Sequence, residues 1–380
     1  MEFDFDTGVD RRNSASLKWE KYRGRDVIPL WVADMDFKAP PAVLALLKER
    51  VEHGVFGYTV PPAELTEVVR ARLSAEYGWE VAEEWLVWLP GLVTGLNVAC
   101  RTAGDEGDGI LTTTPVYPPF LSAPALARRE LQAVPLASDG ARWAIDFDRL
   151  EEAVTSRSRL FLLCNPHNPV GRVYTAEELS RLADLCCRHD LVLCSDEIHA
   201  GLVLDEDKRH LPIATLDPAV SDRTITLLAP SKTYNLPGLG CSFAVIPNAS
   251  LRRRFRGVMA GIVPHVNLFG FTAALAAYRD ADEWHRALLS YLRGNRDLVE
   301  RAVQGMPGSA TTHVEATYLA WLDVRGTGLA EPVRFFEEGG AGLSDGAEFG
   351  LPGFVRLNFG CPRALLAVGL RRMRAALDRL

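Results

Sequence analysis

The chain has 380 residues, 48% of them hydrophobic, which is enough apolar material for two domains or one large domain with an appendage. Its 42 basic and 49 acidic residues give a net charge of −7, which argues against nucleic acid or an anionic membrane as the main partner. Seven cysteines, mostly inside apolar runs, do not resemble a disulfide framework. Neither a secretory signal nor an apolar run of the roughly 20 residues needed to span a bilayer is visible. We therefore expect a cytoplasmic protein.

Residues 1–40 are predicted to form an arm that belongs to a small domain. Most of this segment is polar and mixed in charge, and it ends in the run Trp-Val-Ala-Asp-Met-Asp-Phe at 31–37. A segment of this composition cannot bury a core of its own, so we expect it to lie on another domain or subunit. Helical patterns over 42–51 and 62–77 follow, joined through an apolar loop at 54–58.

From residue 85 onward, short apolar strands alternate with helices. The expected strands span residues 85–89, 110–113, 160–164, 191–194, 224–228 and 242–246. The expected helices span 92–103, 116–127 and a segment after Thr175, where Thr-Ala-Glu-Glu has the pattern of a capping box. This alternation is typical of βαβ units, so it predicts an α/β fold with a mostly parallel sheet flanked by helices, in a large domain over 41–280.

The last hundred residues have a different pattern. A long helical span beyond Gly270 is followed by strand-like runs at 318–324 and 354–359, a Gly-rich stretch between them, and an amphipathic helix from Ala364. These elements predict a smaller α+β domain over 281–380, completed by the N-terminal arm. The sequence contains neither His-Glu-x-x-His nor a Cys-x-x-Cys pair, so we expect no metal site.

Lys232 follows the apolar strand expected at 224–228 and precedes a break at Pro237 and Gly238. A lysine in such a turn lies close to the protein interior. Burial disfavours the ammonium form, which makes the amine available as a nucleophile toward a carbonyl. For a single lysine, a plain surface position is the alternative.

Asp196 ends another expected strand. A carboxylate at the carboxyl end of a buried parallel strand is costly unless it meets a cation, and a protonated pyridine nitrogen would be one. A helix cap or an internal salt bridge explains the same residue equally well.

Four further features lie at predicted strand ends or in an apolar strand. The loop at 165–171 carries two asparagine amides, including that of Asn168, that could donate to an anionic oxygen, although it could also be a plain turn. The helix start at 90–95 has free N–H groups that suit a phosphate, or it is an ordinary strand-to-helix turn. Tyr117 could stack on a planar ring or pack in the core. Arg356 could grip a carboxylate bidentately or belong to a buried ion pair.

Four motifs occur in a recognisable order: Asn-Pro-x-Asn-Pro-x-Gly, Ser-Asp-Glu-Ile-His, Ser-Lys-Thr-Tyr-Asn and Phe-Val-Arg-Leu-Asn. As a set they resemble the class I/II aminotransferases among the fold type I pyridoxal-phosphate enzymes. Within that family, the runs 31–37, 54–58 and 318–323, with His199 and Asn235, most resemble the cystathionine β-lyase (MalY/PatB-type C–S lyase) branch. The resemblance runs from about residue 10 to the C terminus. It implies a seven-stranded-type sheet in the large domain and pyridoxal 5'-phosphate as the cofactor.

The resemblance also implies roles for the matched positions. Lys232 would bind the cofactor covalently and would be catalytic together with Tyr58 and Tyr117. The residues implied to hold the cofactor are Lys232, Asp196 at the pyridine nitrogen, Asn168 at the phenolic oxygen, Tyr117 on the ring face, His199, and around the phosphate Ser231, the amides of Leu92 and Val93, and Tyr58 of a neighbouring subunit. Arg356, with Asn168 and Ala33, would bind the substrate. A site shared in this way implies a homodimer.

The implied reaction is cleavage of cystathionine or another S-substituted L-cysteine to a thiol, pyruvate and ammonia. Two departures from the broader family fit this branch, because Gly240 replaces a common phosphate-binding arginine and His199 replaces a common tyrosine. An aminotransferase that uses the same site is the alternative, and a binding protein that keeps the fold without turnover is a third. The thioether substrate and the group that protonates the leaving thiolate stay open.

Overall fold

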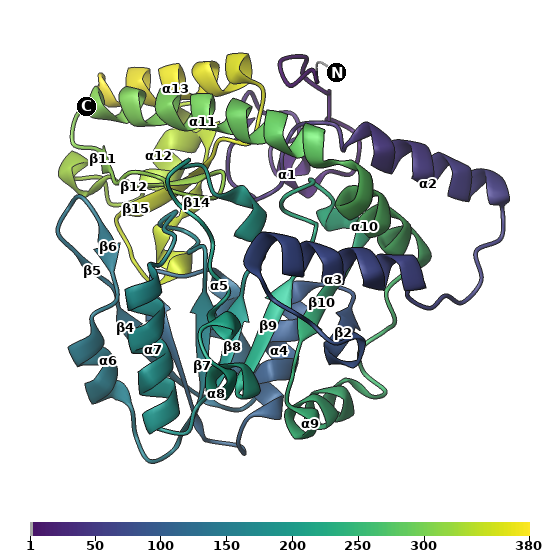
Figure 1. The fold of residues 1–380 in the computed structure, drawn as a ribbon. Helices are drawn as coiled ribbons and strands as arrows, with labels where there is room; N and C mark the ends of the chain where they lie inside the picture. The colour runs from purple at the N-terminus through teal and green to yellow at the C-terminus, as the bar shows by residue number, and fades with distance from the viewer. Residues whose placement is uncertain (1–2) are drawn as a thin grey trace.

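The structure is a computed structural model that describes residues 3–380, and its two main sheets have seven and four strands (Figure 1). The large sheet has seven strands in the order β2-β10-β9-β8-β7-β3-β4, and β10 alone runs against the others. Its strands are β2 (Leu86–Leu89), β3 (Gly109–Thr114), β4 (Glu130–Pro135), β7 (Ser158–Cys164), β8 (Val192–Asp196), β9 (Thr224–Leu228) and β10 (Ser242–Val245). The predicted α/β fold with a mostly parallel sheet is confirmed.

Helices cover both faces of the large sheet because alternate residues of each strand point to opposite sides. Leu160 and Leu162 of β7 pack in one apolar cluster, whereas Phe161 and Leu163 pack in the other. The first cluster is covered by α4 (Leu92–Thr102), α5 (Pro118–Leu126) and α9 (Ala249–Met259), and the second by α6 (Phe147–Ala153), α7 (Ala176–Arg188) and α8 (Pro218–Asp222). The capping box at Thr175 is confirmed at the start of α7.

Three local predictions differ from the structure. Trp85 belongs to a short 3-10 turn, η1 (Glu83–Trp85), so β2 starts one residue later. The long helical span after Gly270 is two helices, α10 (Leu268–Asp280) and α11 (Asp282–Gln304), which break at Ala281. Strand β4 was not predicted, because it is an edge strand with mostly exposed or half-buried residues and lacks an apolar run.

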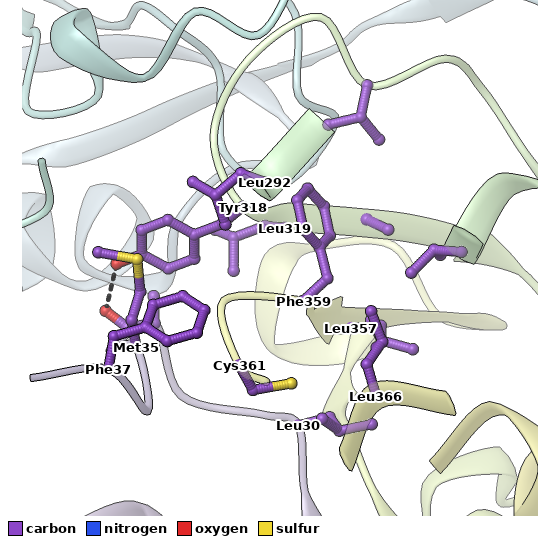
Figure 2. Close-up of a cluster of buried hydrophobic side chains, with 14 of the residues drawn as sticks. Leu30, Met35, Phe37, Leu292, Tyr318, Leu319, Leu357, Phe359, Cys361 and Leu366 are labelled. Atoms are coloured by element: carbon purple, nitrogen blue, oxygen red, sulfur yellow. Dashed lines mark hydrogen bonds between the residues drawn. The ribbon is translucent and has the colours of Figure 1, made fainter. Parts of the chain in front are cut away.

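The small sheet has four antiparallel strands in the order β11-β12-β15-β14. Its strands are β11 (Ala310–Thr311), β12 (Leu319–Asp323), β14 (Ser344–Asp345) and β15 (Phe354–Asn358), and its helices are α11, α12 (Pro332–Glu338) and α13 (Arg363–Leu377). Helices α11 and α13 lie side by side above the sheet (Figure 1). Figure 2 shows Leu292 of α11 and Leu366 of α13 in the apolar cluster that also holds Leu357 and Phe359.

The N-terminal arm packs into this same cluster. It contains α1 (Leu17–Glu20) and β1 (Ile28–Pro29), which pairs in parallel with β13 (Ala341–Gly342). In Figure 2, Met35 and Phe37 of the arm lie beside Tyr318, and Leu30 of the arm lies beside Leu366. The remaining elements are α2 (Pro41–His53) and α3 (Ala63–Tyr77), both packed on α10, and the small hairpin of β5 (Ala137–Ser138) and β6 (Trp143–Ala144). Within residues 3–380, no helix combines the length and apolar character that crossing a membrane requires.

Candidate active site

The carboxyl ends of β3, β7, β8 and β9 meet at one edge of the large sheet, where ligands bind in open α/β folds. Tyr117, Asn168 and Lys232 follow β3, β7 and β9, and Asp196 ends β8. All four side chains line a single cavity of about 220 Å³. The structure thus brings these four predicted residues together. A larger cavity of about 400 Å³, between the β5–β6 hairpin and the small sheet, contains none of the predicted site residues.

Lys232 is half-buried in the turn after β9, as predicted. Its Nζ donates a hydrogen bond to the backbone oxygen of Ala33, 2.6 Å away in the arm. Burial, with a smaller contribution from the nearby Arg356 guanidinium, lowers the pKa of Lys232 to about 8, although the carboxylates of Asp34 and Asp196 act in the opposite direction. About a tenth of this amine is therefore uncharged at pH 7, far more than for an ordinary lysine, and able to act as a nucleophile or a base.

Asp196 is 4% exposed, and its Oδ1 accepts one hydrogen bond, 3.1 Å long, from the backbone N–H of Ile198. In the described part of the chain it forms no ion pair with a lysine, arginine or histidine. Burial raises the pKa of Asp196 to about 7. A buried carboxylate without a cation fits a ligand that supplies one, such as a protonated ring nitrogen. The helix-cap and salt-bridge alternatives are not what the structure shows.

Arg356 projects from β15 and is a buried cation without a carboxylate partner among residues 3–380. Its Nη1 donates to Asn168 Oδ1 at 3.0 Å, and its Nη2 donates to the backbone oxygen of Trp31 at 2.9 Å. The guanidinium also lies 4.7 Å from the ring centroid of Phe349, and its Nε has no partner. Burial lowers the pKa of Arg356 to about 10, so the side chain is charged at neutral pH and can still bind an anion.

Tyr117 and Asn168 are connected through the backbone, because the N–H of Tyr117 donates to the oxygen of Asn168 at 3.0 Å. Burial raises the pKa of Tyr117, so its hydroxyl is neutral. His199 is 2% exposed and also lines the cavity, where burial holds its pKa well below the usual range and keeps the imidazole neutral. Its ring lies edge-on to Tyr318, 6.2 Å away, and its Nδ1 has no hydrogen-bond partner.

The opposite end of the cavity is formed by the start of α4. The first N–H groups of α4, at Leu92 and Val93, have no intrahelical acceptor because they lie in the first turn of the helix. Gly91, which precedes the helix, provides no side chain that could cap them. Ser231 lies at the same cavity. Lys232 is the one cation among the described residues that line it. This end has the N–H groups and helix dipole that suit a phosphate.

Gly240 explains why the common arginine is missing at this end. Its φ is +58°, a left-handed conformation that side chains other than glycine rarely adopt. A Cβ atom at this position would also lie 2.8 Å from the backbone oxygen of Pro90. The local backbone therefore excludes a side chain at residue 240.

Tyr58 is the predicted residue that the structure does not bring to the cavity. It is fully exposed, at 110% of the reference accessibility, and it does not line the site of its own chain. This position is consistent with the expectation that Tyr58 acts in a neighbouring subunit.

Some functional contacts were not foreseen from the sequence. Asn358 donates to the backbone oxygens of Val32 and Asp34, at 2.6 and 2.7 Å, and so fixes the arm over the site. Cys164 lines the cavity and accepts a hydrogen bond from the N–H of Asn168. Asn358 stands in an apolar strand two residues after Arg356, which was a usable signal. No group of metal-ligating side chains occurs between residues 3 and 380.

The architecture and the site together define a class of protein. A seven-stranded sheet, a lysine and an unpaired carboxylate at one cavity, and a buried arginine bonded to Asn168 of that cavity fit the fold type I pyridoxal-phosphate enzymes. Residues 25–373 match the family described as Aminotransferase class I and II. The chain therefore belongs to this family.

Several known proteins are similar to this chain over nearly its full length. The chain is 37% identical over 391 residues to the cystathionine beta-lyase PatB of Bacillus subtilis (strain 168), covering 99% of this chain and 100% of that protein. The protein in the crystal structure of OvoB is 47% identical in sequence to this chain. The two structures superpose with a TM-score of 0.97, and 99% of each chain is covered. Cystalysin from Treponema denticola, whose crystal structure contains a pyridoxal 5'-phosphate cofactor, is 32% identical, with a TM-score of 0.96 and full coverage of both chains.

Proposed function

We propose that the chain is a pyridoxal-phosphate-dependent carbon–sulfur β-lyase that cleaves cystathionine or another S-substituted L-cysteine to a thiol, pyruvate and ammonia. The observation that carries this proposal is that the Lys232 amine and the unpaired Asp196 carboxylate share one cavity. The near full-length similarity to a cystathionine beta-lyase favours elimination over transamination.

The side chains present fit the cofactor. Asp196 would supply the buried negative charge that a pyridinium nitrogen needs, and Asn168, which accepts a hydrogen bond from Arg356, would bond the ring's phenolic oxygen. Tyr117 provides an aromatic face in the same cavity, and the N–H groups at the start of α4 with Ser231 receive the phosphate. When bound, the cofactor supplies an electron sink for the carbanion formed at Cα.

The chain's own residues direct the reaction. Arg356 binds the substrate α-carboxylate, which places the Cα–H bond near Lys232. The Lys232 amine removes the Cα proton, and the substituent on Cβ leaves as a thiol or thiolate. Ala33 of the arm lines this cavity and accepts a hydrogen bond from Lys232. Either Tyr58 or Lys232 protonates the leaving sulfur.

The test is incubation of the purified, cofactor-loaded protein with L-cystathionine. We expect a thiol and pyruvate in equal amounts without any added 2-oxo acid, because elimination needs no amino acceptor. L-Alanine, which lacks a leaving group on Cβ, is the matched control and should give no pyruvate under these conditions. Strict dependence of turnover on an added 2-oxo acid would show an aminotransferase instead, and bound cofactor without turnover of any amino acid would show a binding protein.

The active unit is a homodimer in which the partner subunit supplies Tyr58. The loop that carries Tyr58 exposes a run of apolar side chains, with Val55 61%, Phe56 59% and Val60 77% exposed. Contiguous apolar surface of this kind marks an interaction site. A second copy of the chain that covers this loop would bring its own Tyr58 to the phosphate end of the neighbouring cavity.

Mixing two inactive variants tests this arrangement. We expect Lys232→Ala and Tyr58→Ala homodimers each to have little activity, since each lacks one residue in both sites. After subunit exchange, a heterodimer has one doubly substituted site and one intact site, so a random mixture should recover about one quarter of the parent activity. Recovery should be absent if Tyr58 acts within its own chain, and a fully active monomer in sedimentation would contradict the dimer.

The remaining proposals concern organisation and location. Residues 1–40 form the arm, 41–280 form the large cofactor-binding domain and 281–380 form the small domain. All seven cysteines are free thiols, six of the seven buried in apolar clusters, which supports a reducing compartment, the cytoplasm. The partner molecules are an amino-acid substrate and a second copy of this chain, rather than nucleic acid or a membrane.

A further inference from the structure

The arm carries a backbone acceptor for the catalytic lysine. Lys232 Nζ makes a single hydrogen bond within residues 3–380, to the Ala33 oxygen at 2.6 Å. The same oxygen accepts a second hydrogen bond from the Tyr318 hydroxyl at 3.0 Å. A carbonyl oxygen has two lone pairs, so both are used.

The neighbouring carbonyls of the arm are bound by other side chains. Trp31 O accepts from Arg356 and Ser344, and the Val32 and Asp34 oxygens accept from the amide of Asn358. These bonds fix the backbone on both sides of Ala33. The Ala33 oxygen differs from its neighbours, since it is bound by the residue that performs the chemistry.

Asn235 joins the lysine turn to the arm. It accepts from the N–H of Met35 at 2.9 Å and donates to the oxygens of Met35 and Phe37, both at 2.9 Å. Its φ is +56°, a left-handed conformation that asparagine tolerates better than most residues. Because Asn235 lies three residues after Lys232, the turn that carries the amine also fixes the distance to its acceptor.

We propose that the Ala33 carbonyl holds the unattached Lys232 amine while it carries the substrate proton, and that Tyr318 and Asn235 are positioning residues for this oxygen. This inference rests on the proposed lyase function for its role in turnover. With one N–H directed at Ala33, the lone pair or remaining protons of the tetrahedral nitrogen point away from the arm. That side of the amine faces the cavity lined by Tyr117, Asn168 and Asp196.

Substitution of the two positioning residues should change the pKa of Lys232 in opposite directions. A hydrogen bond to the carbonyl favours the ammonium form, so a stronger acceptor raises the pKa of Lys232. The Tyr318 hydroxyl competes for this acceptor, whereas Asn235 keeps it in place. The charged and titratable groups around the amine are Arg356, Asp34, Asp196, His199, Tyr117 and Tyr318.

The experiment measures Lys232 directly in the full-length chain freed of cofactor. Trace acylation with acetic anhydride at a series of pH values, quantified by peptide mass spectrometry, gives the apparent pKa of this lysine. We expect Tyr318→Phe to raise it by about half a pH unit, or about threefold less acylation on the acid side. Asn235→Gly, which keeps the left-handed backbone, should lower it by a similar amount.

Tyr22→Phe is the matched control. Tyr22 is also a buried tyrosine of the arm, but its hydroxyl donates to Glu337 at 2.7 Å and does not contact Ala33. It should leave the titration of Lys232 unchanged. In the cofactor-loaded enzyme, the pH at which kcat falls on the acid side should shift in the same direction as the pKa of Lys232 measured by acylation.

An unchanged or lowered pKa of Lys232 in Tyr318→Phe would overturn the inference, as would shifts of the same sign in both variants. Tyr318→Phe removes a single oxygen atom, so it decides the question if Asn235→Gly fails to fold. Acylation does not depend on turnover. Opposite shifts without pyruvate release would therefore contradict the lyase function and leave the acceptor role of Ala33 in place.

Discussion

Lys232→Ala is expected to reduce pyruvate release from L-cystathionine by about 10³-fold or more, because the substitution removes both the covalent anchor and the base that takes the Cα proton. The chain itself should fold normally, since Lys232 is held by a single hydrogen bond and is paired with no carboxylate. Initial rates of pyruvate formation with saturating cofactor, and circular dichroism of both proteins, provide the measurement.

The control for Lys232→Ala is Lys21→Ala in the arm. Lys21 forms an exposed ion pair with Glu337, 2.9 Å long, and contributes no atom to the cavity. It should retain the parent rate, because exposed ion pairs add little stability. A small primary amine in the buffer should restore part of the activity of Lys232→Ala by replacing the missing base. Product formation at the parent rate in Lys232→Ala would remove the basis of the proposed function.

Asp196→Asn is the substitution with the second large expected effect. It should lower the activity and raise the stability of the cofactor-free chain. Activity should fall by about 10²–10³-fold, because a neutral amide no longer stabilises a protonated ring nitrogen. The cofactor-free chain should become more stable by on the order of 2–4 kcal/mol at pH 8, because the substitution removes a buried carboxylate that has no cation.

The stability effect of Asp196 has a defined pH dependence. Since burial raises its pKa to about 7, the folded chain binds a proton below that pH that the unfolded chain has already released. The stability of the parent therefore falls as the pH rises from the ordinary carboxyl pKa to about 7, and the full penalty is present above it. Urea unfolding of both cofactor-free proteins at pH 4 and pH 8 measures this difference.

Asp207→Asn, a substitution of an exposed loop carboxylate, is the control for Asp196→Asn. It should change neither the activity nor the free energy of unfolding of the cofactor-free chain. A gain in stability that is equal at pH 4 and pH 8 would show that Asp196 is not a buried, unpaired acid. Loss of stability at pH 8 in Asp196→Asn would show that a cation stabilises the Asp196 carboxylate in the folded chain.

The sequence predicted the elements that carry an apolar pattern. Strand β9 was predicted to the residue because all five of its side chains are buried and apolar or small. Strand β8 was predicted two residues short, since its last two residues, Ser195 and Asp196, are polar although they still pair in the ladder. Parallel strands end at a common edge, so the polar residues that follow them could be grouped into one site before the structure was known.

What sequence could not supply was the contribution of the backbone. The acceptor of Lys232 is a carbonyl oxygen, which every residue carries, and it lies 199 residues earlier in the chain. No residue type marks such a position. The same holds for Gly240, whose absence of a side chain is explained by its left-handed backbone and by the nearby oxygen of Pro90.

The pairing of β1 with β13 also determines when the site can form during synthesis. Ile28 leaves the ribosome long before Ala341, its partner in the sheet, and before Asn358, which fixes the arm on either side of Ala33. The large sheet is complete once Val245 has emerged, whereas the arm still has no strand to join. Folding of that sheet on the nascent chain therefore leaves Lys232 without its acceptor. The site can therefore form only after Asn358 has emerged, so a chain that ends before Ala341 would keep the strands of the large sheet and lose the site.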